Sequence, residues 1–273
     1  MSLSFANAPL VEIIAELRWI PPQEVPVLSQ QQPIAFQISF FGGSKQDEFF
    51  MRLGAKLHQQ GFPAVERLVP PGFVTLLYQP IYRYKQAVEP SPVLYQAGAG
   101  LFSANGIPPY RSWEEFAPFV QKGISALVDS RDPKEKESQF ATVSLRYIDA
   151  FRDDLTRGKS GPAFMADVLG IDVKLPDILT GFGRSGKAPQ YALQLALPIS
   201  DDTVLQLNVA EGQVHSNAAI ILDTSVSCNR GIFPEVAELM KVLHSAHEVI
   251  HGIFVKLTAP IRELMQPNEG VPK

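Results

Sequence analysis

The sequence predicts an α+β protein of two similar halves, each a curved antiparallel sheet packed against a long helix in a helix-grip-like duplication. Three observations indicate this fold. Alternating apolar residues predict a strand over 8–20, and its pattern returns in a strand over 141–148. Each strand precedes a helix, several short stretches typical of an antiparallel meander, and a further helix. We expect the halves to cover 1–132 and 138–273, as two units or as one compact domain.

The first half alternates strands and helices. Ser112 and Glu115 form a capping box that opens a helix with an apolar stripe. A second amphipathic helix is predicted over 47–60. The charged, proline-containing segment Arg131–Glu137 is typical of a linker. The remaining extended stretches are predicted at 34–40, 72–79, 82–88, 92–97 and 100–105.

The second half closes with a long helix over 233–257. Seven apolar residues repeat along it with heptad spacing, a stripe that normally packs on a sheet or a partner helix. Before it we expect a short helix near 162–169, a loop over 176–189 and strands over 191–197, 204–209 and 214–223. The seven stripe residues are Val236, Leu239, Leu243, Ala246, Ile250, Ile253 and Leu257.

Composition narrows the class of protein. The 273 residues are 45% hydrophobic and 19% charged, which is ordinary for a globular chain. A net charge of −4 argues against a general polyanion binder, so nucleic acid is not indicated. The lone Cys228 excludes an intrachain disulfide and a thiolate cluster. Without a signal peptide or a span of ~20 apolar residues, we expect a cytoplasmic protein and no membrane partner.

The two opening strands share a motif in which one arginine faces away from a large apolar wall. Leu17–Ile20 and Leu145–Ile148 have this pattern, which would make Arg18 and Arg146 symmetry mates on neighbouring strands. An arginine on such a face usually pairs with a carboxylate.

The functional alternative is a polar groove. In it Arg18, Arg146, Asp149 and Arg152 would hold a carboxylate, a phosphate or the acidic side chain of a partner. These four residues are the candidate binding residues.

A formal HExxH, His247–His251, lies on the last predicted helix. Such a motif holds zinc between two imidazoles while its glutamate activates water, so a zinc-dependent hydrolase using His247, His251 and Glu248 is an alternative function. Helical geometry places Glu248 about 160° from the centre of the apolar stripe, in solvent. No third histidine follows in metzincin spacing. Histidines flanking a packed helix are therefore favoured, with no metal and no catalytic residue expected.

Gly181–Lys187 matches the first seven positions of a phosphate-binding loop. Ala188 stands where that motif needs Ser or Thr, and a strand follows where a helix is required. A plain surface loop is favoured, and we expect no cofactor.

Three landmarks resemble a sporadically distributed family of uncharacterised bacterial proteins of similar length. They are Ala8-Pro9-Leu10-Val11-Glu12, the central Leu145–Ile148, and His247, Ile250 and Phe254 in the C-terminal pattern HxxIxxxF. Asp149 departs from that pattern, which has Asn there. The resemblance implies a bacterial cytoplasmic protein, and its C-terminal pattern does not require Glu248. The patchy distribution that it implies fits a defence or toxin–antitoxin-like module.

These observations predict a non-enzymatic binding or accessory protein with an unknown protein partner. An enzyme is the less favoured reading. We expect a homo-oligomer, with a homodimer formed through an unpaired strand edge or the long helix. Besides the zinc hydrolase, a small-ligand pocket between sheet and helix is a third alternative, since helix-grip folds provide such pockets.

Overall fold

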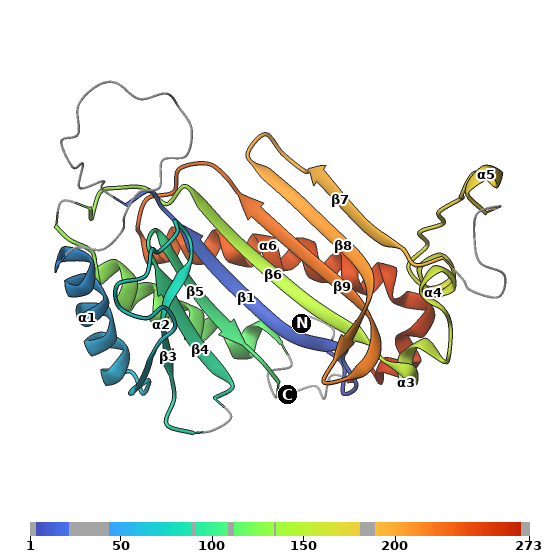
Figure 1. Ribbon diagram of the computed structural model, residues 1–273, viewed down its shortest axis with the longest axis horizontal. Coiled ribbons are helices and arrows are strands. Elements are labelled where there is room, and N and C mark those ends of the chain that lie inside the picture. Colours follow the sequence, from blue (N-terminus) through green and yellow to red (C-terminus); the bar gives the residue numbers. More distant parts are fainter. Residues whose placement is uncertain are drawn as a thin grey trace.

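The computed structural model describes residues 4–21, 44–88, 91–108, 112–133, 135–180 and 189–268. Its centre is one nine-stranded antiparallel sheet with the order β2-β3-β4-β5-β1-β6-β9-β8-β7 (Figure 1). The strands are β1 (Leu10–Arg18), β2 (Ala64–Arg67), β3 (Pro80–Lys85), β4 (Val93–Gly98), β5 (Leu101–Gly106), β6 (Thr142–Phe151), β7 (Ala192–Pro198), β8 (Thr203–Val214) and β9 (Asn217–Cys228).

The middle of the sheet is the pair β1–β6. The two strands run antiparallel, with Ile14 opposite Arg146 and Arg18 opposite Thr142. Segments 1–132 and 138–273 therefore contribute strands to a single sheet. The prediction of two separate sheet-and-helix halves is wrong, because the backbone groups of β1 and β6 pair with each other and join the strands of both segments into one ladder.

The described helices cover one face of this sheet, and the opposite face, on which none of them packs, is termed the open face. The larger ones are α1 (Ser44–Gln59), α2 (Trp113–Ser130) and α6 (Val236–Leu257); the shorter ones are α3 (Asp153–Thr156), α4 (Gly161–Asp167), α5 (Asp177–Thr180) and the 3₁₀ helix η1 (Ala259–Met265). In Figure 1, α2 and α6 lie behind the sheet, where they contact each other and the central strands. No helix in the described part of the chain is both long and apolar enough to cross a membrane.

The main core lies between the sheet and these helices. Ile13, Ala15 and Leu17 of β1 are fully buried there, as the alternation predicts. The apolar stripe of α6 is also confirmed, since Leu239 and Leu243 are fully buried against the sheet. At the start of α2, Ser112 accepts a hydrogen bond from the N–H of Glu115, as the capping box predicts.

Three segments differ from the predictions, one of them the loop expected over 176–189, in which residues 177–180 form α5. Residues 72–79 form no strand and belong to the connection between β2 and β3. Arg131, placed at the start of a linker, is only 2% exposed, and its guanidinium lies 4.8 Å from the ring centre of Phe140. Strand 34–40 and the phosphate-loop match 181–187 lie outside the described residues.

Candidate functional site

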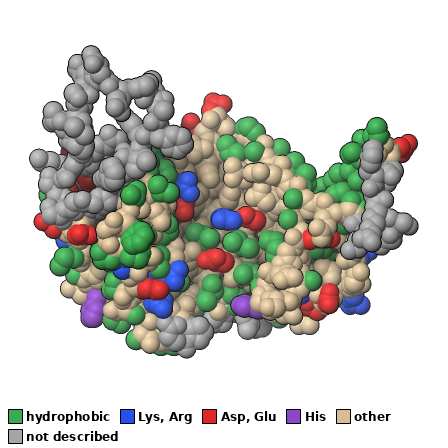
Figure 2. Space-filling view, in the orientation of Figure 1, with side chains coloured by type: hydrophobic (Ala, Val, Ile, Leu, Met, Phe, Trp, Pro, Cys, Tyr) green, Lys and Arg blue, Asp and Glu red, His purple; other side chains and the backbone are tan. Residues whose placement is uncertain are grey.

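The open face of the sheet is the surface opposite α2 and α6. It is polar at its centre, where Figure 2 shows charged side chains of both signs. Arg146 donates to Asp223 on β9 through two hydrogen bonds of 2.7 and 2.6 Å. Glu12 and Glu16 are its diagonal neighbours on β1. The hydrogen bonds to Asp223 raise the pKa of Arg146, with Glu12 and Glu16 adding to the effect. Arg146 thus has the carboxylate partner expected of a strand arginine.

A second polar chain crosses β1 and β5. Asn105 donates to Glu12 at 2.8 Å, and Ser103 donates to Asn105 at 2.8 Å. Ser103 and Asn105 are buried even though they belong to the open face. Their hydrogen bonds hold Glu12 in place beside Arg146, so the centre of this face is fixed before any partner arrives.

Arg18 lies on the same face but does not meet Arg146. The two are separated by four residues along the paired strands, or ~13 Å. Arg18 contacts Glu16 at 2.7 Å, and its guanidinium lies 5.2 Å from the ring centre of Tyr78. Its Nε is buried and has no hydrogen-bond partner among the described residues.

The other two candidate binding residues lie elsewhere. Asp149 is on the helix-covered face, opposite Leu222 of β9, and is 5% exposed. Arg152 is exposed and lies just before α3. The structure therefore brings Arg18 and Arg146 onto one surface and leaves Asp149 and Arg152 outside it.

The two histidines of the formal HExxH pack against neighbouring side chains. Nδ1 of His247 is 2.9 Å from the hydroxyl of Tyr147, and the imidazole stacks on Trp113 and on His251. Burial, helped by the neighbouring His251, lowers the pKa of His247 to about 4. Glu248 is exposed. The described residues contain no group of three or more side chains placed to bind a metal, so the zinc alternative gains no support.

Asp149 lies two residues beyond Tyr147 on the same face of β6. Burial raises the pKa of its carboxyl to about 7, and the charge of Asp223 adds to the effect. Burial also raises the pKa of Tyr147, with Asp149 contributing. This part of the core therefore contains an acid that titrates near neutral pH, which no sequence pattern indicated.

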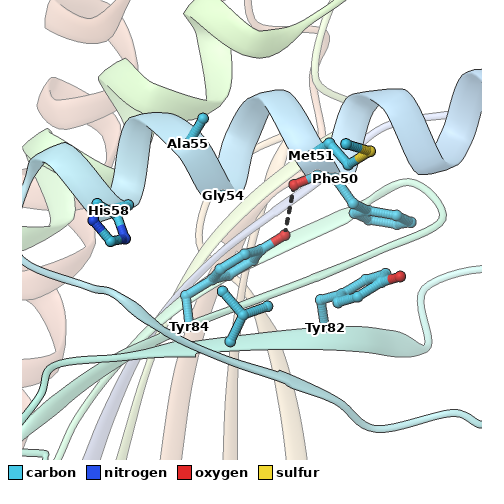
Figure 3. Close-up of a pocket in the computed structure, with 8 residues that line it drawn as sticks. Phe50, Met51, Gly54, Ala55, His58, Tyr82 and Tyr84 are labelled. Carbon is cyan, nitrogen blue, oxygen red and sulfur yellow. Dashed lines mark hydrogen bonds between the residues drawn. The ribbon is translucent and has the colours of Figure 1, made fainter.

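A shallow apolar pocket of about 350 Å³ lies between α1 and the β2–β3 pair (Figure 3). Its polar groups are largely used within the protein: Tyr84 donates to the carbonyl of Phe50 at 3.1 Å, and Tyr82 accepts from Arg67 at 3.1 Å. Such a pocket offers few polar groups to orient a small ligand. Its lining residues are Phe50, Met51, Gly54, Ala55, His58, Val65, Tyr82 and Tyr84.

Residues 70–79, the larger part of the connection between β2 and β3, are termed the apolar loop. It is held at its base, because the N–H of Tyr78 donates to Ala99 at 2.8 Å. A Cβ atom at Gly98 would lie 1.8 Å from the carbonyl oxygen of Gln79, so only glycine lets the loop pass β4 this closely. Tyr78 has a φ of 63°, a conformation that costs a bulky residue free energy.

Beyond this base the loop exposes four large apolar side chains. Phe73 is 69% exposed, Val74 49%, Leu76 62% and Leu77 41%. Figure 2 shows hydrophobic side chains grouped in this part of the open face. Contiguous apolar surface of this kind marks interaction sites in soluble proteins.

The strand predicted over 72–79 is instead this loop, because apolar residues on an exposed loop resemble those of a strand. The signal that separates the two was present in Pro70, Pro71 and Gly72, followed by a run without apolar–polar alternation. Residues of a strand on the sheet edge would alternate, whereas this run exposes neighbouring side chains together.

Comparison with known proteins identifies no relative from which a function could be inferred. No protein-family model, curated protein or solved structure matches this chain. The site is defined by its own geometry, namely an apolar loop anchored beside the Arg18 end of a polar sheet face.

Proposed function

We propose that this chain is a non-enzymatic binding protein whose partner is another protein. The partner would cover the apolar loop and the Arg18 end of the open face. The observation that carries the proposal is the exposure of Phe73, Val74, Leu76 and Leu77 on a loop whose base is fixed by hydrogen bonds. Folding leaves these side chains in water, so a partner gains free energy by covering them.

The surroundings of the loop suit a protein partner. Protein interfaces combine an apolar centre with a polar rim. Here the loop supplies the centre, while the part-exposed ion pair of Arg18 and Glu16 supplies the rim. The loop contains no Lys or Arg, the residues that attract proteins to anionic lipid surfaces. A protein is therefore favoured over a membrane.

The resemblance to a patchily distributed bacterial family favours an accessory role in a defence or toxin–antitoxin-like module. Proteins encoded beside this chain are the first partners to test.

Site-specific photo-crosslinking in cells of the native host tests the proposal. A photoreactive residue replaces Phe73 in one variant and Ile178 of α5 in the matched control, because both side chains are 69% exposed. We expect a discrete protein adduct from position 73 and none from position 178. The absence of an adduct at 73, the same adducts at both positions, or adducts to lipid alone would overturn the proposal.

The affinity of the captured protein for variants of this chain tests how much the apolar loop contributes to binding. Burying a large apolar side chain contributes about 1.5–3 kcal/mol. Replacing both Phe73 and Leu76 by serine should therefore weaken binding by ~100-fold or more. The same replacements at Ile178 and Leu179, which are 69% and 53% exposed, should leave the affinity unchanged.

A further inference from the structure

The two edges of the nine-stranded sheet differ in how they are protected. The edge strand β2 has four residues, among them the charged Glu66 and Arg67. Short length and charge are the usual protection of a sheet edge against pairing with another chain. The opposite edge strand, β7, has seven residues, Ala192–Pro198, with no charged side chain and no register shift against β8. No segment in the described part of the chain pairs with its outer edge.

The side chains of β7 are apolar on the face that carries the helices. Leu195 and Leu197 lie opposite Leu207 and Leu205 of β8, both of which are buried. Leu195 itself is 36% exposed and Leu197 49% exposed. The leucines of β7 thus extend the buried apolar layer of β8 to the edge of the sheet, where they are partly exposed to solvent.

We infer that β7 pairs with β7 of a second copy of this chain, antiparallel and centred on Leu195. The sequence Ala-Leu-Gln-Leu-Ala-Leu-Pro is self-complementary in this register. Leu195 lies opposite the partner's Leu195, and Leu193 lies opposite the partner's Leu197. A twofold axis perpendicular to the sheet keeps both leucine rows on the same face, where they form one continuous apolar strip.

The surroundings of β7 favour a second copy over another occupant. The strand has no charge that would select a basic or acidic partner, and the backbone N–H and C=O groups on its outer edge, with which no described segment pairs, can form a ladder with another strand. The same register places the partner's Tyr191 opposite Ile199, which lines a groove of about 360 Å³ beside α6 together with Val242 and Val249. The groove adds apolar area to a ladder that is itself ~23 Å long.

The oligomeric state of the full-length protein tests the inference. In sedimentation equilibrium, we expect the wild type to be dimeric at micromolar concentration. Leu195→Lys places two like charges opposite each other on the twofold axis and should raise the dimer dissociation constant ~100-fold or more. A wild type that stays monomeric at ~100 times that concentration, or a Leu195→Lys variant that dimerises as tightly as the wild type, overturns the inference.

A cross-linking variant tests the register even where Leu195→Lys fails to fold. Residues directly opposite in an antiparallel pair have Cβ atoms about 4.5–5.5 Å apart, within reach of a disulfide after a small adjustment. In a Cys228→Ser background, Leu195→Cys should give a covalent dimer on mild oxidation. Leu179→Cys on α5, also exposed, is the matched control and should stay monomeric. Equal cross-linking of both variants, or none at position 195, contradicts the register.

Discussion

Replacing Asp149 by asparagine should change how the stability of this protein depends on pH. Burial raises the pKa of Asp149 from 3.8 to about 7 in the folded protein. Between these values the folded state holds a proton that the unfolded chain has released, so the carboxyl destabilises the fold as pH rises from about 4 to about 7. Asparagine does not titrate, and the variant escapes this penalty.

The size of the effect follows from the two pKa values. They differ by about three pH units, and each corresponds to about 1.4 kcal/mol, so the penalty in the wild type reaches about 4 kcal/mol above pH 7. The amide of asparagine adds a constant cost of about 1–3 kcal/mol if its donors find no partner. At pH 8 the variant should therefore be more stable by about 1–3 kcal/mol, whereas at pH 4 it should be less stable.

Urea unfolding of both proteins at pH 4, 6 and 8 measures this difference. His247, whose pKa burial lowers to about 4, has the opposite pH dependence, since its contribution to stability is lost as pH falls from 6.5 toward 4. It is present in both proteins and largely cancels in the comparison. A difference in unfolding free energy that changes by less than about 1 kcal/mol between pH 4 and pH 8 would refute the reasoning.

Three further substitutions have expected outcomes that denaturant unfolding checks. Gly98→Ala drives a Cβ into the carbonyl of Gln79 and should destabilise the protein by about 1–3 kcal/mol while shifting the apolar loop; an unchanged midpoint would contradict this close approach. Tyr147→Phe leaves Nδ1 of the buried His247 without its 2.9 Å partner and should cost about 1–3 kcal/mol, and a loss below about 0.3 kcal/mol would be inconsistent with that bond. Ser112→Ala removes the cap of α2 and should cost about 1 kcal/mol, with Ser112→Asp retaining stability as the control.

Local chemistry made several elements predictable from sequence. Alternation over 8–20 predicted β1, because a period of two describes a strand with one buried face. The heptad stripe predicted α6, and the Ser112 cap predicted where α2 begins. Each of these signals lies within a few residues of the feature that it predicts.

The arrangement of the strands could not be predicted in the same way. The neighbouring position of β1 and β6, expected from the repeated arginine motif, is confirmed, but no pattern in either strand records that their backbone pairing joins the strands of both segments into one ladder. The two sheets expected from sequence are for this reason one sheet. The apolar loop was likewise missed, since composition alone does not distinguish exposed apolar residues from a buried strand.

The sequence does contain the pattern that shows on which face of β6 Asp149 lies. Counting from Arg146 with a period of two places position 149 on the other face of β6, with Leu145 and Tyr147. The alternation thus argues against the prediction that Asp149 belongs to the polar groove, and the structure shows that this prediction was wrong. What the sequence could not supply is the depth of burial that moves its pKa to about 7.

The position of β1 has a consequence for how the chain folds. Ile14 lies opposite Asn105 on one side and opposite Arg146 on the other. β1 is synthesised early, whereas β5 and β6, with which it pairs, are synthesised much later. Such nonlocal contacts slow folding to the range of milliseconds to seconds. During synthesis, at about 5–20 residues per second, the outer edge of β1 stays open for several seconds after β5 has paired. A nascent chain halted before residue 142 would expose that edge to other chains, so the strand at the middle of the finished sheet depends on protection while the chain is being synthesised.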